Sequence, residues 1–233
     1  RVPRRVHTFT GLIWPTSVGV KKKILMATDW LTCACATHII PEGEGVKNDL
    51  QSHIIKKPMK VLGFGNIKGV DMEYFSISTI QGSRMMADLQ EMKGESFTFL
   101  FVGRIVGDKG INELCLAFNR LHVQYPKTKL WLVGAFEEKL DPVKAETRTL
   151  IENKDNGIEA VGIKKGRDLL AYYATADCFI MPSYREGFPN TVLEAGAMGL
   201  PSIVTDINGS REIIKEGENG MIVPPRDEES LFI

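Results

Sequence analysis

From residue 96 onward, short apolar runs alternate with segments in which apolar residues recur at helical spacing. The run FTFLFV at 97–102 predicts a buried strand, and 109–123 predicts a helix because its apolar positions share one face. Further strands are expected at 129–133, 158–161, 177–181, 201–205 and 220–223, with helices from Asp141-Pro142, at 167–175, at 190–198 and after Gly209. Strands and helices that alternate strictly and are joined by short loops predict an α/β fold with a doubly wound parallel sheet.

The N-terminal part of the chain has a shorter and less regular pattern of the same kind. Strands are expected at 6–10 and 60–65, a helix at 42–52, and a helix or strand at 24–33. Residues 71–95 are polar and mixed, which predicts a connection between two domains. We therefore expect an incomplete Rossmann-like domain plus linker over 1–95 and a second Rossmann-like domain over 96–233. The chain opens on an expected strand and closes as DEESLFI begins a helix, so both ends are expected to be cut.

The composition is that of a protein with a substantial core, with 43% hydrophobic and 25% charged residues. No apolar run approaches the length of a membrane-spanning helix, and the opening RVPRRVHTFTG lacks the apolar stretch of a signal peptide. The four cysteines are too few and too scattered for a disulfide framework. These features together predict a cytoplasmic protein.

Charge is unevenly distributed, although the net charge is zero. Residues 1–70 hold 11 Lys and Arg against 4 Asp and Glu, whereas the remainder holds 18 against 25. A basic first part predicts contact with an anionic partner, such as a phosphate or lipid head groups on the inner face of the plasma membrane. The alternative is that solvated lysines keep this surface soluble. No basic stripe interleaved with aromatic residues is present, so nucleic-acid binding is not expected.

The segment YREGFPNTVLEAGAMGLPSIVTD at 184–206 carries the strongest candidate chemistry. Glu186 falls in the loop after the strand at 177–181, and Glu194 follows on the next helix with seven residues between them. Ligands of open parallel sheets bind at the carboxyl edge of the strands. The helix that begins near Asn190 offers free N–H groups and a positive dipole end to an anion. Two carboxylates for sugar hydroxyls beside such a helix suit a ligand that is part sugar and part phosphate.

A second candidate is FVGRIVGDKG at 101–110, which places Arg104 and Lys109 just beyond the first strand of the second domain. A diphosphate leaving group gains negative charge as its bond to the sugar breaks, so fixed cations there stabilise the transition state more than the ground state. Arg can hold two oxygens at once, while Lys acts as a point charge. The alternative is that both are solvated surface cations.

Three stretches together resemble the retaining glycosyltransferases of family four (group 1), which have the GT-B fold. They are GRIVGDKG at 103–110, AYYATADCFIMPSYREGFPNTVLEAGAMGLP at 171–201 and INGSREIIKEGENGMIVPP at 207–225. Upstream, THIIPEGEGVKNDL and VLGFGNIKGVD resemble the bacterial capsule and O-antigen members. The resemblance implies a UDP- or GDP-type sugar donor bound by 96–233. It also implies an acceptor hydroxyl on a glycan or polyprenyl-linked carrier, contacted mostly by the N-terminal domain.

The resemblance gives each matching position an expected role. Glu186 is expected to touch hydroxyls of the transferred sugar, Glu194 the ribose, and Arg104 and Lys109 the diphosphate. The loop of Val161, Gly162 and Ile163 is expected near the base, and Phe188, Pro189 and Asn190 are expected to present backbone amides to the diphosphate. Gly103 and Gly187 are further donor-binding candidates, and Glu212 is expected at the border of the donor.

One position departs from the family's pattern. The family often has a histidine in the strand-end loop of the N-terminal domain, and Thr10 aligns with it here, so Thr10 is an acceptor-side candidate. His7 falls inside the expected strand and is assigned to packing.

The resemblance also implies retention of the anomeric configuration, either through a covalent carboxylate intermediate or by front-face attack. Because Glu186 belongs to the hydroxyl-binding loop, we do not assign it as a nucleophile. Front-face attack requires only cations and amide groups that are positioned around the leaving phosphate. No metal or other cofactor is expected, since the chain has no Asp-x-Asp pair and its cations compensate the phosphate charge.

Other motifs are weaker. GFGNIK at 63–68 begins like a dinucleotide fingerprint, but Lys68 replaces the third glycine. Cys33, Cys35 and His38 lack a fourth metal ligand and are interpreted as packed residues. Two rival functions stay open, a nucleotide-sugar 2-epimerase of the same architecture and a non-catalytic nucleotide-sugar binding module. An epimerase needs acid and base groups at the hexose, and the Glu186 loop has no histidine.

Overall fold

The computed structural model describes residues 2–232, which form two compact units. The first unit comprises residues 2–69 together with the short segments 185–190 and 207–213. The second unit comprises residues 70–184, 191–206 and 214–232. Both units combine parallel strands with helices, so the expected α/β class is confirmed.

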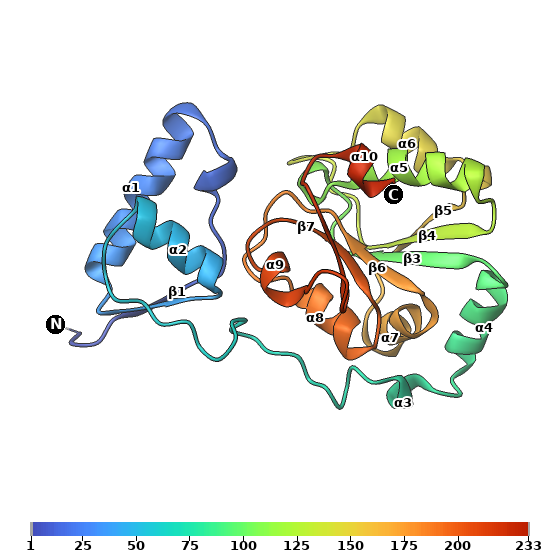
Figure 1. The fold of residues 1–233 in the computed structure, drawn as a ribbon, viewed down its shortest axis with the longest axis horizontal. Coiled ribbons are helices and arrows are strands. Elements are labelled where there is room, and N and C mark those ends of the chain that lie inside the picture. Colours follow the sequence, from blue (N-terminus) through green and yellow to red (C-terminus); the bar gives the residue numbers. More distant parts are fainter. Residues whose placement is uncertain (1, 233) are drawn as a thin grey trace. The chain divides into compact units, whose positions relative to one another are not determined.

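Six parallel strands form the sheet of the second unit, in the spatial order β5-β4-β3-β6-β7-β8 (Figure 1). The strands are β3 (Phe97–Val102), β4 (Thr128–Val133), β5 (Ile158–Gly162), β6 (Cys178–Met181), β7 (Ser202–Thr205) and β8 (Gly220–Val223). The chain builds outward from β3 to β5, then crosses to the other side of β3 and builds outward again from β6. The winding direction therefore reverses between β3 and β6.

Helices cover both faces of this sheet, which explains why its central strands are continuous apolar runs. Leu100, Phe101, Trp131 and Phe179 are fully buried. Figure 1 shows α5, α6 and α10 over one face and α7 and α8 over the other. The helices are α5 (Ile111–Gln124), α6 (Ala145–Glu152), α7 (Gly166–Thr175), α8 (Asn190–Ala197) and α10 (Glu228–Leu231), with 3-10 turns η2 (Gly107–Lys109) and η3 (Lys154–Asn156).

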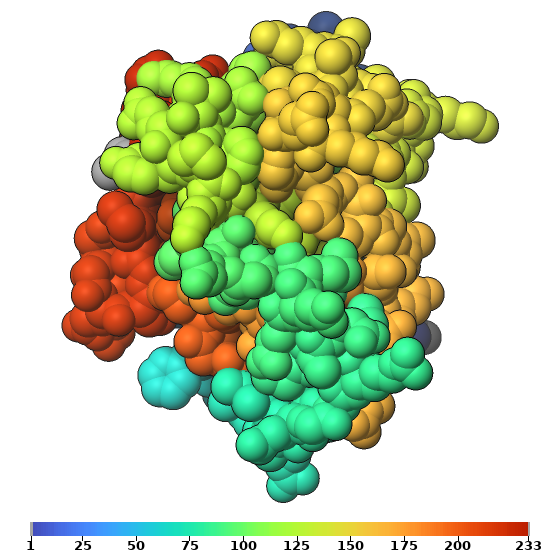
Figure 2. All heavy atoms as spheres, turned by 90° about the vertical axis from the view of Figure 1, so that its right-hand side faces the viewer, coloured from blue at the N-terminus to red at the C-terminus, as the bar shows by residue number. Residues whose placement is uncertain are grey.

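Residues 70–95 contain two further helices of the second unit, α3 (Ile77–Ile80) and α4 (Arg84–Lys93). The Ser83 side chain accepts the N–H of Met86 and so caps α4. At the other end of α4, Lys93 Nζ lies 2.5 Å from Asp177 Oδ1. Figure 2 shows this teal and green segment lying against the orange segment that contains α7.

The first unit is built on two parallel strands, β1 (Val6–Phe9) and β2 (His38–Pro41), with Val6 opposite His38 and Phe9 opposite Pro41. Its other elements are η1 (Trp14–Thr16), α1 (Gly19–Cys35), α2 (Glu44–His53) and α9 (Ser210–Ile213). Its core side chains are Phe9, Leu12, Trp14, Cys33, Ala36, Ile39, Val46 and Leu50. No helix within residues 2–232 combines the length and apolar content needed to cross a membrane.

Two local predictions are wrong. Residues 60–65 form no strand: a turn at 63–64 and a bend at 65 interrupt the segment, because Gly63 (φ 57°), Gly65 (φ 102°) and the following Asn66 (φ 58°) adopt positive φ, which an extended strand excludes. The helix expected from Asp141 begins only at Ala145. Asp141 instead accepts the N–H groups of Gly107 and Asp108 with its carbonyl and carboxylate. The ambiguous segment 24–33 is helical and belongs to α1, and the short strand β2 was not predicted.

Candidate functional site

At the carboxyl edge of the second sheet, the winding direction reverses between two neighbouring strands. β3 and β6 are neighbours, and the chain leaves their carboxyl ends in opposite winding directions. In open α/β sheets, ligands bind outside the carboxyl ends of the strands at this reversal. The segment 103–110 follows β3, and the loop that begins at Pro182 follows β6. Both sequence-predicted segments therefore start at the expected edge.

Hydrogen bonds and a close backbone approach join the segment 103–110 and its helix α5 to the start of the loop at 182–184. The N–H of Tyr184 donates to the carbonyl of Asp108 at 2.9 Å, and the Tyr184 hydroxyl donates to Glu113 Oε2 at 2.7 Å. Gly110 has φ 70°, and a Cβ at this position would overlap the carbonyl oxygen of Pro182. A glycine is therefore required at 110 both for the left-handed backbone and for the close approach.

The two predicted phosphate-binding cations lie on this fixed backbone. Arg104 follows Gly103, whose N–H donates to the Val133 carbonyl at 3.0 Å. Arg104 is exposed, and Lys109 is half-buried in η2. The neighbouring residues Ile105 and Val106 are fully buried. Buried aliphatic anchors next to an exposed guanidinium fix the backbone while leaving the charge accessible to a ligand.

Glu194 is held by a tyrosine that sequence patterns assign only to packing. The Tyr173 hydroxyl on α7 donates to Glu194 Oε2 at 3.0 Å, and Tyr173 is fully buried. Burial, followed by the Glu194 charge, raises the pKa of Tyr173 well above its ordinary value, so Tyr173 stays a hydrogen-bond donor. This bond fixes one carboxylate oxygen of Glu194.

The predicted base-binding residues close the edge strand β5. Val161 is half-buried, while Gly162 (φ 73°) and Ile163 (62% exposed) lie open to solvent. The Gly162 carbonyl accepts the N–H of Gly134, so this loop continues the same carboxyl edge.

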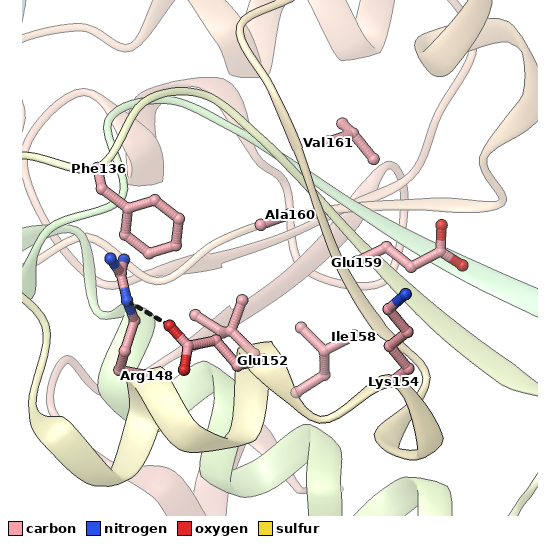
Figure 3. Close-up of a pocket in the computed structure, with 9 residues that line it drawn as sticks. Phe136, Arg148, Glu152, Lys154, Ile158, Glu159, Ala160 and Val161 are labelled. Carbon is pink, nitrogen blue, oxygen red and sulfur yellow. Dashed lines mark ion pairs between the residues drawn. The ribbon is translucent and has the colours of Figure 1, made fainter.

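A cavity of about 660 Å³ lies along β5, and it includes only one of the predicted site residues, Val161. Figure 3 shows Phe136 and the paired Arg148 and Glu152 on one side of the strand, with Glu159 and Val161 pointing to the other. The Arg148 guanidinium stacks on Phe136 at 4.1 Å and pairs with Glu152 at 2.9 Å. The Arg148 charge in this cavity is therefore already paired within the chain.

In the first unit, close backbone approaches pack the segment 185–190 against residues 10 and 11. A Cβ on Gly187 would overlap the Thr10 carbonyl, and a Cβ on Gly11 would lie 3.4 Å from Gly187 Cα. The Phe188 ring is buried in front of Gly43 and Gly65. Larger side chains at these glycines would displace the Phe188 ring or the Gly187 backbone.

Residues 66 and 190 are joined by their side chains. Asn66 Nδ2 donates to Asn190 Oδ1 at 2.8 Å, and Asn66 Oδ1 accepts the N–H of Gly69 at 2.6 Å. Asn66 therefore joins its own turn to Asn190, the last residue of the segment 185–190 in the same unit. The expectation that Pro189 offers a backbone amide is wrong, because proline carries no N–H.

Glu212 stabilises a helix start within the first unit. Its two carboxylate oxygens accept the N–H groups of Glu44 at 2.6 Å and Gly45 at 3.0 Å, and Gly209 N–H donates to Oε1 at 3.2 Å. The N-cap residue of α2, Gly43, has no side chain for this purpose. Glu212 thus supplies the cap from another segment, and its predicted place at the border of a donor stays a prediction.

The structure sorts the predicted residues into two sets. The second unit carries Gly103, Arg104, Lys109, Val161, Gly162 and Ile163 at one sheet edge and Glu194 on α8. The first unit carries Thr10, Glu186, Gly187, Phe188, Pro189 and Asn190 around one cavity, and Glu212 outside its lining. Glu42, Asn66 and Tyr173 contact these residues and were missed. A predicted strand at 38–41 would have singled out Glu42 as a strand-end residue.

Comparisons with known proteins identify the family of the chain. A sequence profile of the family "Glycosyl transferases group 1" matches residues 96–232. The Staphylococcus aureus capsular polysaccharide biosynthesis glycosyltransferase CapM is 31% identical over 97% of this chain and 58% of its own length. An Escherichia coli UDP-Gal:alpha-D-GlcNAc-diphosphoundecaprenol alpha-1,3-galactosyltransferase is 28% identical over 99% of this chain and 59% of its own. The chain thus spans less than two thirds of either relative.

Among solved structures, Anabaena HepE in complex with UDP superimposes with a TM-score of 0.80 at 18% identity, covering 97% of this chain and 60% of HepE. The architecture is that of GT-B glycosyltransferases. Because the profile covers more than half of the residues, the chain belongs to the glycosyl transferases group 1 family.

Proposed function

We propose that this chain is the donor-binding part of a retaining glycosyltransferase of family four. The enzyme would move a hexose-type sugar from a UDP- or GDP-type donor to a hydroxyl of a glycan or polyprenyl-linked acceptor during the synthesis of a bacterial surface polysaccharide. The observation that carries the proposal is the reversal point between β3 and β6, where Arg104 and Lys109 follow one strand and the Glu186 loop follows the other. The names of the S. aureus and E. coli relatives support this chemistry.

In this proposal, Arg104 and Lys109 bind the pyrophosphate of the donor. Their charge counters the negative charge that develops on the leaving phosphate as the glycosidic bond breaks. The guanidinium holds two phosphate oxygens and the ammonium one. The backbone of 103–110 is held by the close approach of Gly110 to the Pro182 carbonyl. This supports the role, because a cation on a fixed backbone need not be reoriented during the reaction.

The carboxylates bind hydroxyl groups. Glu194 takes the ribose hydroxyls, with the Tyr173 hydroxyl fixing one of its oxygens at 3.0 Å. Glu186 takes hydroxyls of the transferred sugar and lines a polar cavity with Asn190 and Thr10. The uracil or guanine base lies near Val161–Ile163, as the exposed end of β5 allows.

Transfer then proceeds by front-face attack. The acceptor hydroxyl attacks the face from which the nucleoside diphosphate departs, and the leaving phosphate oxygen takes the acceptor's proton, so the configuration is retained. Glu186 acts in binding and forms no covalent intermediate. In this scheme no metal is required, because Arg104 and Lys109 supply the positive charge.

We further propose that the first unit contacts an anionic membrane surface through α1. Val20, Ile24 and Leu31 are 73%, 59% and 58% exposed, and they recur at helical spacing along α1. Lys21 and Lys23 are exposed on the same helix. Exposed apolar residues beside basic ones are typical of helices that lie in the membrane interface.

A thermal-shift screen of UDP, GDP and their hexose conjugates tests the donor proposal. A ligand at about 100 times its Kd stabilises the native state by about 2.7 kcal/mol, and inorganic phosphate at the same concentration is expected to do far less. Glu194→Ala should remove most of the shift, while Glu146→Ala, an exposed residue of α6, should preserve it. Equal shifts with phosphate and with nucleotides would contradict the proposal.

A further inference from the structure

The first unit holds a polar cavity of about 410 Å³ that contains a carboxyl group not anticipated from the sequence. Thr10, Glu42, Ile67 and Lys68 line it together with residues 186–190. Glu42 follows β2 directly and is only 7% exposed. A carboxyl group this deep is costly unless polar partners compensate the lost hydration.

Glu42 is fixed by the backbone on two sides. Its N–H donates to the Phe9 carbonyl at 2.9 Å, and its carbonyl accepts the N–H of Asn66 at 2.7 Å. The Ile67 N–H donates to its carboxylate. Oε2 faces Gly187, where a Cβ would lie 2.7 Å away. The carboxyl group is therefore preorganised against the loop that carries Glu186.

The electrostatics of this cavity favour a neutral ligand rich in hydroxyl groups. Burial raises the pKa of the Glu42 carboxyl group, the Ile67 N–H lowers it, and the charge of Glu186 raises it further. The Glu42 carboxylate repels a phosphate, whereas a hydroxyl can donate a hydrogen bond to it. An ionised carboxylate has roughly four acceptor positions, and the Ile67 N–H uses one. Lys68, which lines the same cavity, offers a donor for hydroxyl oxygens.

We propose that Glu42 is a specificity-determining residue that accepts a hydrogen bond from a hydroxyl of the sugar carried by the nucleotide donor. This inference rests on the proposed function and deepens it, since it assigns the Glu42–Glu186 cavity to the sugar and not to the pyrophosphate. Glu42 contributes to sugar choice and leaves the affinity for the nucleotide itself unchanged.

A purely structural role for Glu42 makes a different prediction. If the carboxylate served only to hold the turn at 66–67, its replacement would weaken every ligand by the same factor. Glu42→Gln separates the two cases, because the amide oxygen can still accept the Ile67 N–H while the charge and one acceptor oxygen are lost. Glu44→Gln, an exposed residue two positions along, is the matched control.

Isothermal titration of the full-length protein with UDP, GDP, their hexose conjugates and the monodeoxy analogues of the tightest conjugate provides the test. We expect Glu42→Gln to bind the nucleoside diphosphate within twofold of the wild type and the conjugate about tenfold more weakly. A site built to bond a hydroxyl rejects the analogue that lacks it. For one deoxy analogue, we expect the wild type and Glu44→Gln to bind it more weakly than the unmodified conjugate. Glu42→Gln should bind this analogue and the unmodified conjugate with equal affinity.

The outcomes separate this inference from the proposed function. An unchanged affinity ratio of conjugate to nucleotide in Glu42→Gln, or an equal loss for both ligands, overturns the role of Glu42 and leaves the donor proposal standing. The role of Glu42 is also overturned if the wild-type protein binds the nucleotide and its hexose conjugate with equal affinity. A protein that binds neither nucleotide nor conjugate overturns the proposed function, and the role of Glu42 falls with it.

Discussion

The two units position their candidate residues by different means. In the second unit, Arg104 and Lys109 follow a strand of a six-stranded parallel sheet whose central residues are fully buried. In the first unit the sheet has two strands, and the segments 185–190 and 207–213 are held by backbone contacts at glycines and by the Glu212 carboxylate. One unit takes its geometry from a regular sheet, the other from contacts between segments far apart in sequence.

This difference predicts how each region responds to substitution. On the sheet edge, an exposed cation can be removed without disturbing the backbone, so its loss should affect ligand chemistry alone. In the first unit, a single carboxylate or glycine holds two or three segments together, so its loss should disturb the fold as well.

Arg104→Ala should have the largest effect on activity. Loss of one preorganised group that counters transition-state charge reduces turnover by about 10²–10³-fold, or about 2.7–4 kcal/mol. We expect this loss in steady-state kinetics of the full-length protein with unchanged stability, because Arg104 is exposed. Arg84→Ala, with a side chain that is 94% exposed, is the control. Normal turnover in Arg104→Ala would exclude a role for Arg104 in catalysis.

Gly110→Ala tests whether the close approach to Pro182 fixes the sheet edge. Gly110 and Gly82 have nearly equal φ values, 70° and 73°, but a Cβ meets nothing within 4 Å at Gly82. Gly82→Ala should therefore cost about 1 kcal/mol for the left-handed backbone alone. Gly110→Ala should lower the free energy of unfolding by about 2–4 kcal/mol, since steric overlap adds to this cost. Urea denaturation measures both, and equal losses would argue against the close approach.

Glu212→Gln should destabilise the first unit by about 1–2 kcal/mol, because neutral acceptors replace charge-assisted bonds at the start of α2. Hydrogen exchange of the Glu44 and Gly45 amides should accelerate, while amides of β3 and β4 should not change. Glu218→Gln is a control, as its side chain is 71% exposed. Unchanged α2 protection together with a lost nucleotide affinity would instead place Glu212 on the donor.

Lys23→Ser is expected to have the smallest effect. A basic residue near an anionic bilayer contributes about 1 kcal/mol, so vesicle affinity should fall about fivefold. Cosedimentation with vesicles that contain phosphatidylglycerol measures this, and vesicles of phosphatidylcholine alone should bind neither form. Lys139→Ser, an exposed residue of the second unit, is the control. Equal binding of Lys23→Ser and wild type would remove α1 from the proposed membrane surface.

The sequence predicted the second unit well, because most of its strands are short apolar runs that end at or next to a glycine or proline. The strand ends at Gly103, Gly134 and Gly162 follow directly from that pattern, as does the position of Arg104 just beyond the first of these strands. Its main error, the helix start at Asp141, arose because the Asp141 carbonyl accepts the N–H of Gly107 and its carboxylate accepts the N–H of Asp108.

The first unit was predicted less completely for a physical reason. Alternation cannot identify a four-residue strand such as β2, and turn residues such as Gly63 and Gly65 lie within an otherwise apolar run. The contacts of Glu42 with Asn66, of Asn66 with Asn190 and of Glu212 with Glu44 join positions that are 24, 124 and 168 residues apart along the chain. No local pattern encodes such pairs.

The decisive measurement for donor binding is a crystal structure of the full-length protein with a bound UDP-hexose. We expect the pyrophosphate within hydrogen-bond distance of Arg104 and Lys109, and the ribose hydroxyls on the Glu194 carboxylate. A pyrophosphate bound elsewhere, for example along β5 beside Arg148, would contradict it.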